Sequence, residues 1–291
     1  MLTYIDAIAR EGSIRKAAEA LHVASSALNR QLIDLETALG SPLFERLPRG
    51  VRPTAAGEVF IVYARQTISE LKVVGSRIEQ LRGLVRGRVC VDAAESVTDH
   101  LLPTEITKFQ LDHPKVQFQV RIGTPQELTD ALLDDRADMV LTHEAPRDRD
   151  VAVIAAAGQI LCAIISSGHP LSRGSKLRLR DCLAYPVALQ DGSLAGRVLI
   201  DQALSHASFD LEPALVSNSI ALMMAFTRIN HGVCFQFRSR SGDRAPLHGM
   251  TAIPVLDPKV AQAKLFLAVR RGRALPIAAA SFAEQLRLEL S

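Results

Sequence analysis

Apolar and polar positions near the start of the chain follow a pattern that predicts two short helices joined by a tight turn. Ala17 and Ala18 are small enough to let the first helix lie close to its neighbour, and Leu21 and Val23 fill the corner between them. Apolar residues then form one stripe along the second helix: Leu28, Leu32, Leu35 and Leu39. Gly40 follows at the position where glycine commonly ends a helix. The pattern is typical of a helix-turn-helix.

The face of the second helix opposite this stripe carries short hydrogen-bonding side chains and one arginine, Arg30. Such side chains can contact base edges when a helix lies in the major groove of DNA. Residues 40–57 form a turn-rich arm with arginines spaced to contact phosphates or the minor groove. The candidate DNA-binding residues are Ser13, Arg15, Lys16, Ser25, Ser26, Asn29, Arg30, Arg46, Arg49 and Arg52. A helical hairpin with a merely solvated outer face is the competing interpretation.

A single long helix is predicted from residue 54 to about residue 84. Its apolar positions recur with a 3.5-residue period, which is typical of helices that pair along a seam. At about 1.5 Å per residue it spans roughly 45 Å, too long for burial in a small domain. The expected dimerisation residues are Phe60, Ala64, Leu71, Val74, Ile78 and Leu81. The alternative is a helix that packs only on its own domain.

Beyond residue 88, predicted strands and helices alternate in two successive units, which favours open, mainly parallel sheets with a cleft between two lobes. Open sheets of this kind bind ligands at the carboxyl ends of their strands. The residues expected there to bind an effector are Ser96, Thr98, Thr124, Thr142, Ser193, Asn218 and Phe235. Hydroxyl groups before helices also serve as plain helix caps, which is the competing role for each of them. Glu95, Glu144 and Asp191 lie nearby, so either the effector is not simply an anion or these side chains point away.

The N-terminal region closely resembles the LysR-type transcriptional regulators. The shared motifs are Gly12-Ser13, Ala17-Ala18-x-x-Leu21, Leu35-Glu36, Leu39-Gly40, Leu43-Phe44-x-Arg46 and Thr54-x-x-Gly57, followed more loosely by Leu101-Leu102-Pro103 and His169-Pro170-Leu171. The chain has Ala24-Ser25-Ser26 where the family usually has Ser-Gln-Pro. The resemblance implies an α/β chain with an N-terminal winged helix-turn-helix, a long linker helix and a two-lobed effector domain similar to type 2 periplasmic binding proteins.

The resemblance also implies a division of the chain and a set of partners. Residues 1–57 would bind DNA, with the helix-turn-helix at about 13–39, and residues 58–87 would dimerise. Residues 88–291 would bind the effector, with lobe I at about 88–160 and 266–291 and lobe II at about 161–265. The expected partners are a double-stranded DNA operator, a small-molecule effector for which a carboxylate is the favoured class, a second copy in a homodimer or homotetramer, and the transcription machinery.

Charge and composition narrow the class of protein further. Residues 1–87 hold 12 Lys and Arg against 9 Asp and Glu, whereas residues 88–291 balance at 22 each, so the net charge of +3 lies on the proposed DNA-binding part. We expect a cytoplasmic protein, because no leader or membrane span is recognisable. His143, His169 and the scattered carboxylates lack the spacing of a catalytic site, so we expect no enzyme, and no cofactor or metal. The alternatives are an exported solute-binding protein and a thiol-based redox regulator that uses one of the four cysteines.

Overall fold

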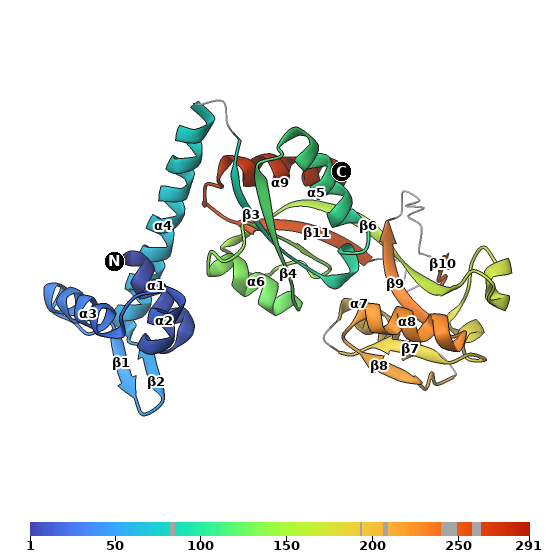
Figure 1. Cartoon of the computed structure of the whole chain (residues 1–291). Helices are drawn as coiled ribbons and strands as arrows, with labels where there is room; N and C mark the ends of the chain where they lie inside the picture. The colour runs from blue at the N-terminus through green and yellow to red at the C-terminus, as the bar shows by residue number, and fades with distance from the viewer. Residues whose placement is uncertain (82–84, 193, 206–208, 240–248, 258–262) are drawn as a thin grey trace.

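The chain is divided into an N-terminal head, one long helix and two lobes (Figure 1). The computed structural model describes residues 1–81, 85–192, 194–205, 209–239, 249–257 and 263–291. Head and lobe II lie on opposite sides of lobe I, and the long helix α4 connects the head to lobe I. No helix in these described ranges is long and apolar enough to cross a membrane.

The head is a winged helix-turn-helix. It comprises α1 (Leu2–Glu11), α2 (Ile14–Ala20), α3 (Ser25–Leu39) and the hairpin of β1 (Phe44–Leu47) and β2 (Gly50–Pro53), which is the wing. The Ser13 hydroxyl accepts a hydrogen bond from the Lys16 amide and so caps α2, and Gly40 ends α3 with a φ of 67°. Apolar side chains from all three helices close the core, among them Ile5, Ala17 and Leu28.

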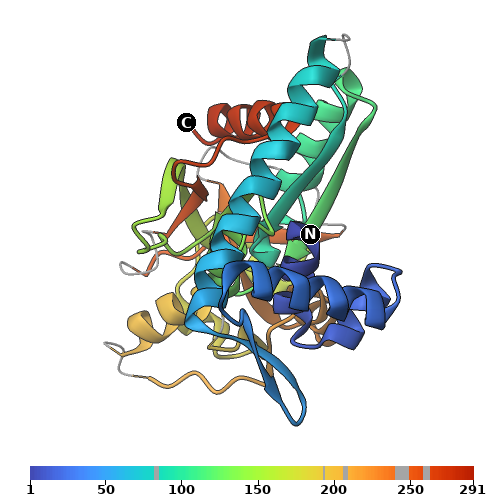
Figure 2. The same cartoon turned by 90° about the vertical axis from the view of Figure 1, so that its left-hand side faces the viewer.

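The long helix α4 (Ala55–Leu81) buries one face and exposes the other. The Thr54 hydroxyl accepts a hydrogen bond from the Gly57 amide and starts the helix. Ile61 and Val73 are buried on the inner face. The exposed face carries large apolar side chains: Val59, Val62, Tyr63, Leu71, Val74 and Ile78. Figure 2 shows α4 crossing the front of the view, from the head upward past lobe I.

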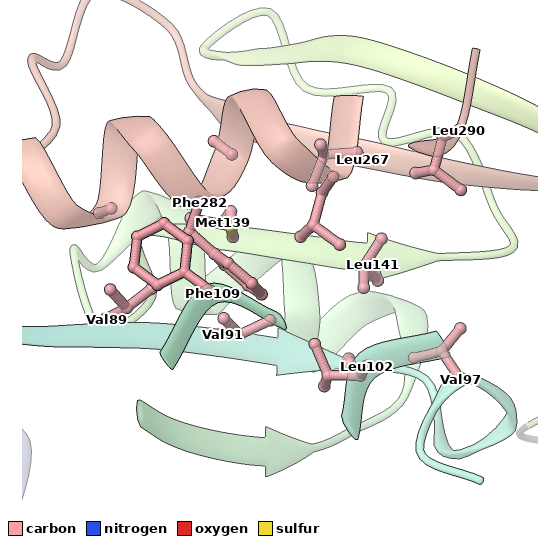
Figure 3. Packing of buried hydrophobic residues seen from close by; sticks show 14 of the residues in the cluster. Val89, Val91, Val97, Leu102, Phe109, Met139, Leu141, Leu267, Phe282 and Leu290 are labelled. Carbon is pink, nitrogen blue, oxygen red and sulfur yellow. The ribbon is translucent and has the colours of Figure 1, made fainter. Parts of the chain in front are cut away.

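Lobe I is an α/β unit that packs helices on a sheet. It contains β3 (Gly87–Ala93), the short helix η1 (Glu95–Val97), α5 (Leu101–Asp112), β4 (Val116–Ile122), α6 (Pro125–Leu133), β5 (Met139–Thr142), most of β11 (Ala263–Arg270) and α9 (Ile277–Glu289). Strand β3 pairs in parallel with β4 and β5. Between α5, α9 and the sheet, Phe109 and Phe282 meet edge to face with ring centroids 5.3 Å apart (Figure 3).

Lobe II repeats the arrangement on the far part of the same sheet. It contains η2 (Pro170–Arg173), η3 (Leu179–Cys182), β7 (Val187–Gln190), α7 (Ala195–Leu204), β8 (Leu215–Ser217), α8 (Ile220–Asn230), β9 (Val233–Ser239) and β10 (Met250–Pro254). Strand β7 pairs in parallel with β8 and β9. Its core is separate from that of lobe I and surrounds Phe235 and Leu189.

One long strand, β6 (Val151–Ser166), joins the lobes. Its first half pairs antiparallel with β11 and its second half pairs antiparallel with β9 and β10. The sheet of the described chain is therefore mixed, in the order β4-β3-β5-β11-β6-β9-β7-β8, rather than mainly parallel as we expected. The parallel pattern holds within each lobe, but the strands that cross between the lobes run against their neighbours.

Two glycines of α4 provide a test of how tightly the head is joined to this helix. A Cβ at Gly57 would overlap the backbone carbonyl of Leu43, whereas a Cβ at Gly75 would meet nothing within 4 Å. Gly57→Ala should therefore lower the free energy of unfolding by about 1–3 kcal/mol or more, and Gly75→Ala should raise it by about 0.5–1 kcal/mol through helix propensity. Urea unfolding followed by circular dichroism measures both. A Gly57→Ala protein as stable as the wild type would contradict the packing described for this junction.

Candidate functional site

The exposed face of α3 presents the polar side chains that the sequence suggested for DNA contact. Ser25, Ser26 and Arg30 are exposed along its first two turns. Asn29 lies beside them, and its Oδ1 accepts a hydrogen bond of 2.8 Å from Arg46 Nη2 of the wing. The contact fixes the orientation of the wing strand relative to α3. Because Arg46 donates to Asn29, the Asn29 amide nitrogen remains to donate to a base or phosphate.

Some of the basic side chains around this face form ion pairs and others do not. Arg15 and Arg52 are paired with Glu19 and Glu45, at 3.5 Å and 2.7 Å. In contrast, the side chains of Lys16, Arg30 and Arg49 form no hydrogen bond or ion pair with the described residues. These three cations are exposed and lie on α2, on α3 and in the turn of the wing. They are the charges best placed to replace counterions on DNA without first breaking a contact.

The predicted dimerisation seam is divided between two environments. Leu71, Val74 and Ile78 are exposed on one side of α4. Ala64, however, is fully buried within its own chain, and Phe60 packs partly against the core of the head. The prediction was wrong at Ala64, because the first two turns of the seam face α1 before the helix leaves the head. The side chain of Leu81 lies outside what the structure describes.

Charged contacts attach α4 to lobe I. Arg65 donates from Nε to Asp6 of α1 at 2.8 Å and also pairs with Asp134, which caps the end of α6. Farther along α4, Ser69 accepts a hydrogen bond of 2.7 Å from Arg273 of lobe I. The head and lobe I thus contact opposite sides of the same arginine. Sequence patterns gave no sign of this joint, because its members are 59 and 69 positions apart.

A small cavity lies between the lobes at the carboxyl ends of the strands. Its free volume is about 30 Å³, room for one or two water molecules. It is lined by Ala94, Glu95, Ser96, Gly123, Pro125, Thr142, His143, Gln190, Leu194, Gly196, Ile220, Gln236 and Phe237. Of the predicted effector-binding residues, the structure brings Ser96 and Thr142 to this cleft. Ser96 and Phe237 also border a wider cavity of about 240 Å³ on the side of α5 and α9.

Ser96 and His143 form one hydrogen-bonded pair on the wall of the cleft. Ser96 Oγ is 2.6 Å from His143 Nε2, and His143 Nδ1 is 3.1 Å from the carbonyl oxygen of Lys264. A carbonyl only accepts, so Nδ1 carries the proton and Nε2 accepts from the Ser96 hydroxyl. Burial lowers the pKa of His143 to about 4, which keeps the imidazole neutral at pH 7. Its ring lies 4.2 Å from that of Phe237.

The other predicted effector-binding residues do not line this cavity. Thr98 donates to the carbonyl of Glu95 at 2.6 Å, and Thr124 forms a complete capping box with Glu127 at the start of α6. Asn218 is exposed outside the cleft, and the Phe235 side chain is fully buried in the core of lobe II. The prediction was wrong for Phe235, because the alternation of side chains along β9 turns it into the core of lobe II. Thr98 and Thr124 serve as caps in this structure, and the effector-binding role of these two residues and of Asn218 stays a prediction. Ser193 lies outside the described residues.

Glu95 and two glutamines are among the polar cleft residues that the predicted effector-binding set did not include. Glu95 of lobe I accepts hydrogen bonds from the amides of Ile220 and Ala221, at the start of α8 in lobe II. Gln190, at the end of β7, and Gln236, in the middle of β9, are almost completely buried. The Gln190 amide donates to the carbonyl of Phe235. Both glutamines have a buried polar atom without a hydrogen-bond partner in the described chain.

The cysteines and His169 have structural environments. Cys162, Cys182 and Cys234 are buried free thiols, and burial raises their pKa to about 11, 12 and 12. Thiols held in the protonated form react slowly with oxidants. His169 accepts from the Leu171 amide at 3.1 Å and lies 3.1 Å from the carbonyl of His231, so both ring nitrogens are satisfied. Within the described ranges, no group of three or more His, Cys, Asp or Glu side chains is arranged to hold a metal ion.

Both the head and the two lobes match known protein families. Residues 1–58 match the model for "Bacterial regulatory helix-turn-helix protein, lysR family", and residues 82–291 match the model for "LysR substrate binding domain". The chain belongs to the LysR family of bacterial regulators, as its motifs predicted. It is a ligand-responsive transcriptional regulator that binds DNA.

Individual relatives agree with this assignment over nearly the whole chain or about two thirds of it. A probable RuBisCO transcriptional regulator of Trichormus variabilis is 25% identical over 291 residues, which span 98% of this chain and 86% of that protein. The SDS degradation transcriptional activation protein of a Pseudomonas species is 32% identical over 194 residues, 64% of this chain and 62% of that protein.

Solved structures confirm the predicted fold. A full-length OxyR variant from Pseudomonas aeruginosa superposes with a TM-score of 0.70 at 21% identity, covering 99% of this chain and 96% of that one. Full-length CbnR, complexed with its target DNA, gives a TM-score of 0.57 at 23% identity, covering 100% and 98%.

The buried imidazole of His143 should make stability depend on pH. Its pKa is about 4 in the folded chain, against 6.5 for an ordinary histidine, so the unfolded chain binds the extra proton between these values. The stability contributed by neutral His143 is complete above pH 6.5 and is lost as the pH falls toward 4. Over that window the wild type should lose about 1–3 kcal/mol more than His143→Gln, a range discounted for the partial exposure of the ring. Thermal unfolding of both proteins across the window measures the difference, and parallel profiles would contradict the assignment.

Proposed function

We propose that the chain reads an operator through α3 and the wing as a homodimer, and that a small polar effector binds between its lobes. The observation that carries the proposal is the surface of the head, where Asn29 is held in place by Arg46 beside the exposed Arg30. Base-specific contacts would come from the N-terminal half of α3, and Lys16 and Arg49 would contact phosphates. Because operator DNA lies in the bacterial cytoplasm, we place the protein there.

The exposed apolar face of α4 supports pairing with a second copy. Leu71, Val74 and Ile78 are all about half exposed or more, and they follow one side of a helix of 27 residues. A contiguous apolar face of this kind is costly in water and is relieved when it meets an equivalent helix. Such pairing brings two heads together so that they bind two half-sites. Dimers of this kind can associate further into a tetramer and contact the transcription machinery.

The cleft between the lobes is the proposed effector site. Ser96 and Thr142 lie on its lobe I side, and Gln190 and Gln236 on its lobe II side. The free volume of about 30 Å³ admits no molecule larger than a few atoms, so effector binding requires the lobes to move apart. Such movement would change the arrangement of the dimer on DNA. We propose no catalysed reaction for this cleft.

Two arginines of the head should affect DNA binding in different ways. Arg30→Ala should weaken binding to the cognate sequence by about 1–3 kcal/mol and relax base preference if, as we propose, this side chain contacts a base edge. Arg49→Ala in the wing should weaken all sequences alike and lower the salt slope by about one, because the proposed contact of Arg49 is with phosphate. Mobility shifts with an operator selected from a random duplex library, and with a scrambled copy, measure both effects.

Arg173→Ala is the matched control, because it removes one arginine from lobe II, far from the head. It should leave both affinity and salt slope unchanged. Wild-type affinity and sequence preference in folded Arg30→Ala would exclude α3 as the element that reads the operator.

The α4 pairing can be tested with one charge. Leu71 is 63% exposed in the single chain, so Leu71→Glu should leave the monomer folded. In a dimer the carboxylate would face an apolar partner without a counter-charge, and the chains should separate. Analytical ultracentrifugation should show monomers for this variant and dimers or larger assemblies for Leu111→Glu, which changes a 79% exposed leucine on α5. If Leu71→Glu sediments like the wild type and binds the operator normally, α4 is not the pairing surface.

A further inference from the structure

Glu95 reaches from lobe I across the cleft to the first turn of a helix in lobe II. Its two carboxylate oxygens lie 2.9 Å and 3.0 Å from the Ile220 amide nitrogen, and Oε1 lies 3.3 Å from that of Ala221. The next amide of α8, that of Leu222, donates to the hydroxyl of Ser219 at 3.3 Å. The first three free N–H groups of an 11-residue helix are thus occupied by side chains of the protein itself.

The start of α8 would otherwise attract an anion. Unpaired N–H groups and the positive end of the helix dipole together favour carboxylates and phosphates. The carboxylate present here belongs to the chain, and it joins the two lobes at the mouth of the cleft. An effector carboxylate can take this position only by displacing Glu95, which would leave a second negative charge beside the first.

Two buried polar atoms of the described cleft residues have no partner, the acceptor Gln190 Oε1 and the donor Gln236 Nε2, and Ser96 adds lone pairs that can accept. Gln190 donates to the carbonyl of Phe235, which fixes its amide orientation and leaves its buried Oε1 without a partner. Ser96 donates its hydroxyl proton to His143, so its oxygen also has lone pairs to offer. Gln236 Nε2 is the one buried donor left unpaired among the described cleft residues. A complementary ligand therefore supplies N–H or O–H donors rather than negative charge.

We propose that Glu95 determines the specificity of the effector cleft by filling the anion position at the start of α8. The cleft therefore selects an uncharged or cationic effector that is rich in hydrogen-bond donors, such as a primary amide or an amine. The proposal rests on the proposed function in that it takes the cleft to be the effector site. It replaces the carboxylate class that hydroxyl groups at the strand ends suggested.

Acetate tests the occupied position directly, because it is the fragment that Glu95→Ala removes. In Glu95→Ala the vacated N–H groups of α8 should bind acetate, so sodium acetate should raise the thermal midpoint of the variant in a saturable manner. Sodium chloride at the same ionic strength should not, and acetamide, itself a primary amide, should stabilise the variant no more than it stabilises the wild type. The wild type should show no such response, because its anion position is filled. Glu144→Ala, which removes an exposed carboxylate from another part of the cleft region, should behave like the wild type.

Glu95→Gln separates charge from shape. Its amide oxygen can still accept a hydrogen bond from Ile220 while filling the space, so this variant should melt below the wild type and ignore acetate. A midpoint equal to that of the wild type would show that the charge is not what α8 holds, and would overturn the proposal even if Glu95→Ala did not fold.

Matched pairs of carboxylic acids and their primary amides, screened by thermal shift, test the selectivity. Amides or amines should stabilise the wild type, and only Glu95→Ala should gain responses to acids. A folded Glu95→Ala protein that ignores acetate, or a wild type stabilised by acids in a manner lost in Gln190→Ala, would overturn the proposal. Operator binding by the same preparations is the separate test of the proposed function. A wild-type protein that binds no operator would contradict that function, independently of the result with acetate.

Discussion

One guanidinium group joins the head, the long helix α4 and lobe I. Arg65 projects from α4 between the carboxylates of Asp6 in the head and Asp134 in lobe I. Burial opposes the charge on Arg65, but the hydrogen bond to Asp6 and the charges of both carboxylates outweigh burial and raise its pKa. A partly buried ion pair contributes little beyond its desolvation cost, but losing one partner leaves a charge uncompensated. The placement of head and lobe I about α4 therefore depends on all three groups remaining together.

The ion pair of Arg65 with Asp134 lies at one end of helix α6, and the other end of α6 borders the proposed effector cleft. Helix α6 has nine residues, about 13 Å in length. Gly123 and Pro125, at its start, line the cavity, and Asp134, at its end, pairs with Arg65. A capping box between Thr124 and Glu127 makes the first turn rigid. A ligand that displaced this helix would therefore move Asp134, the residue that pairs with Arg65. The Thr124 hydroxyl, which we expected to contact the effector, caps this helix in the structure.

Periodic patterns could be predicted from the sequence, and contacts between distant residues could not. The stripe of Leu28 and Leu32, the glycine that ends α3 and the length of α4 follow from local rules that need no tertiary structure. The effector-binding residues were harder to predict. Thr98 and Thr142 both follow predicted strands and both carry a hydroxyl, yet the Thr98 hydroxyl donates to the Glu95 carbonyl in its own turn. The sequence indicated that Glu95 is a negative charge near the strand ends, which disfavours an anionic effector. Its partner, the first turn of α8, is 125 residues away, and no local pattern indicates a pairing of that range.

A carboxylate that belongs to the protein is a stronger barrier to anionic ligands than its hydrogen bonds alone suggest. Because Glu95 is attached to lobe I, it meets the α8 amides without losing translational freedom, at an effective concentration far above that of a free metabolite. A free carboxylate therefore competes at a disadvantage for a position where it would gain only equivalent contacts. A donor-rich molecule has no such competitor, because Gln190 Oε1 and the lone pairs of Ser96 are still unpaired when Glu95 is in place. The contact that closes the lobes thus also decides which molecules gain free energy by binding between them.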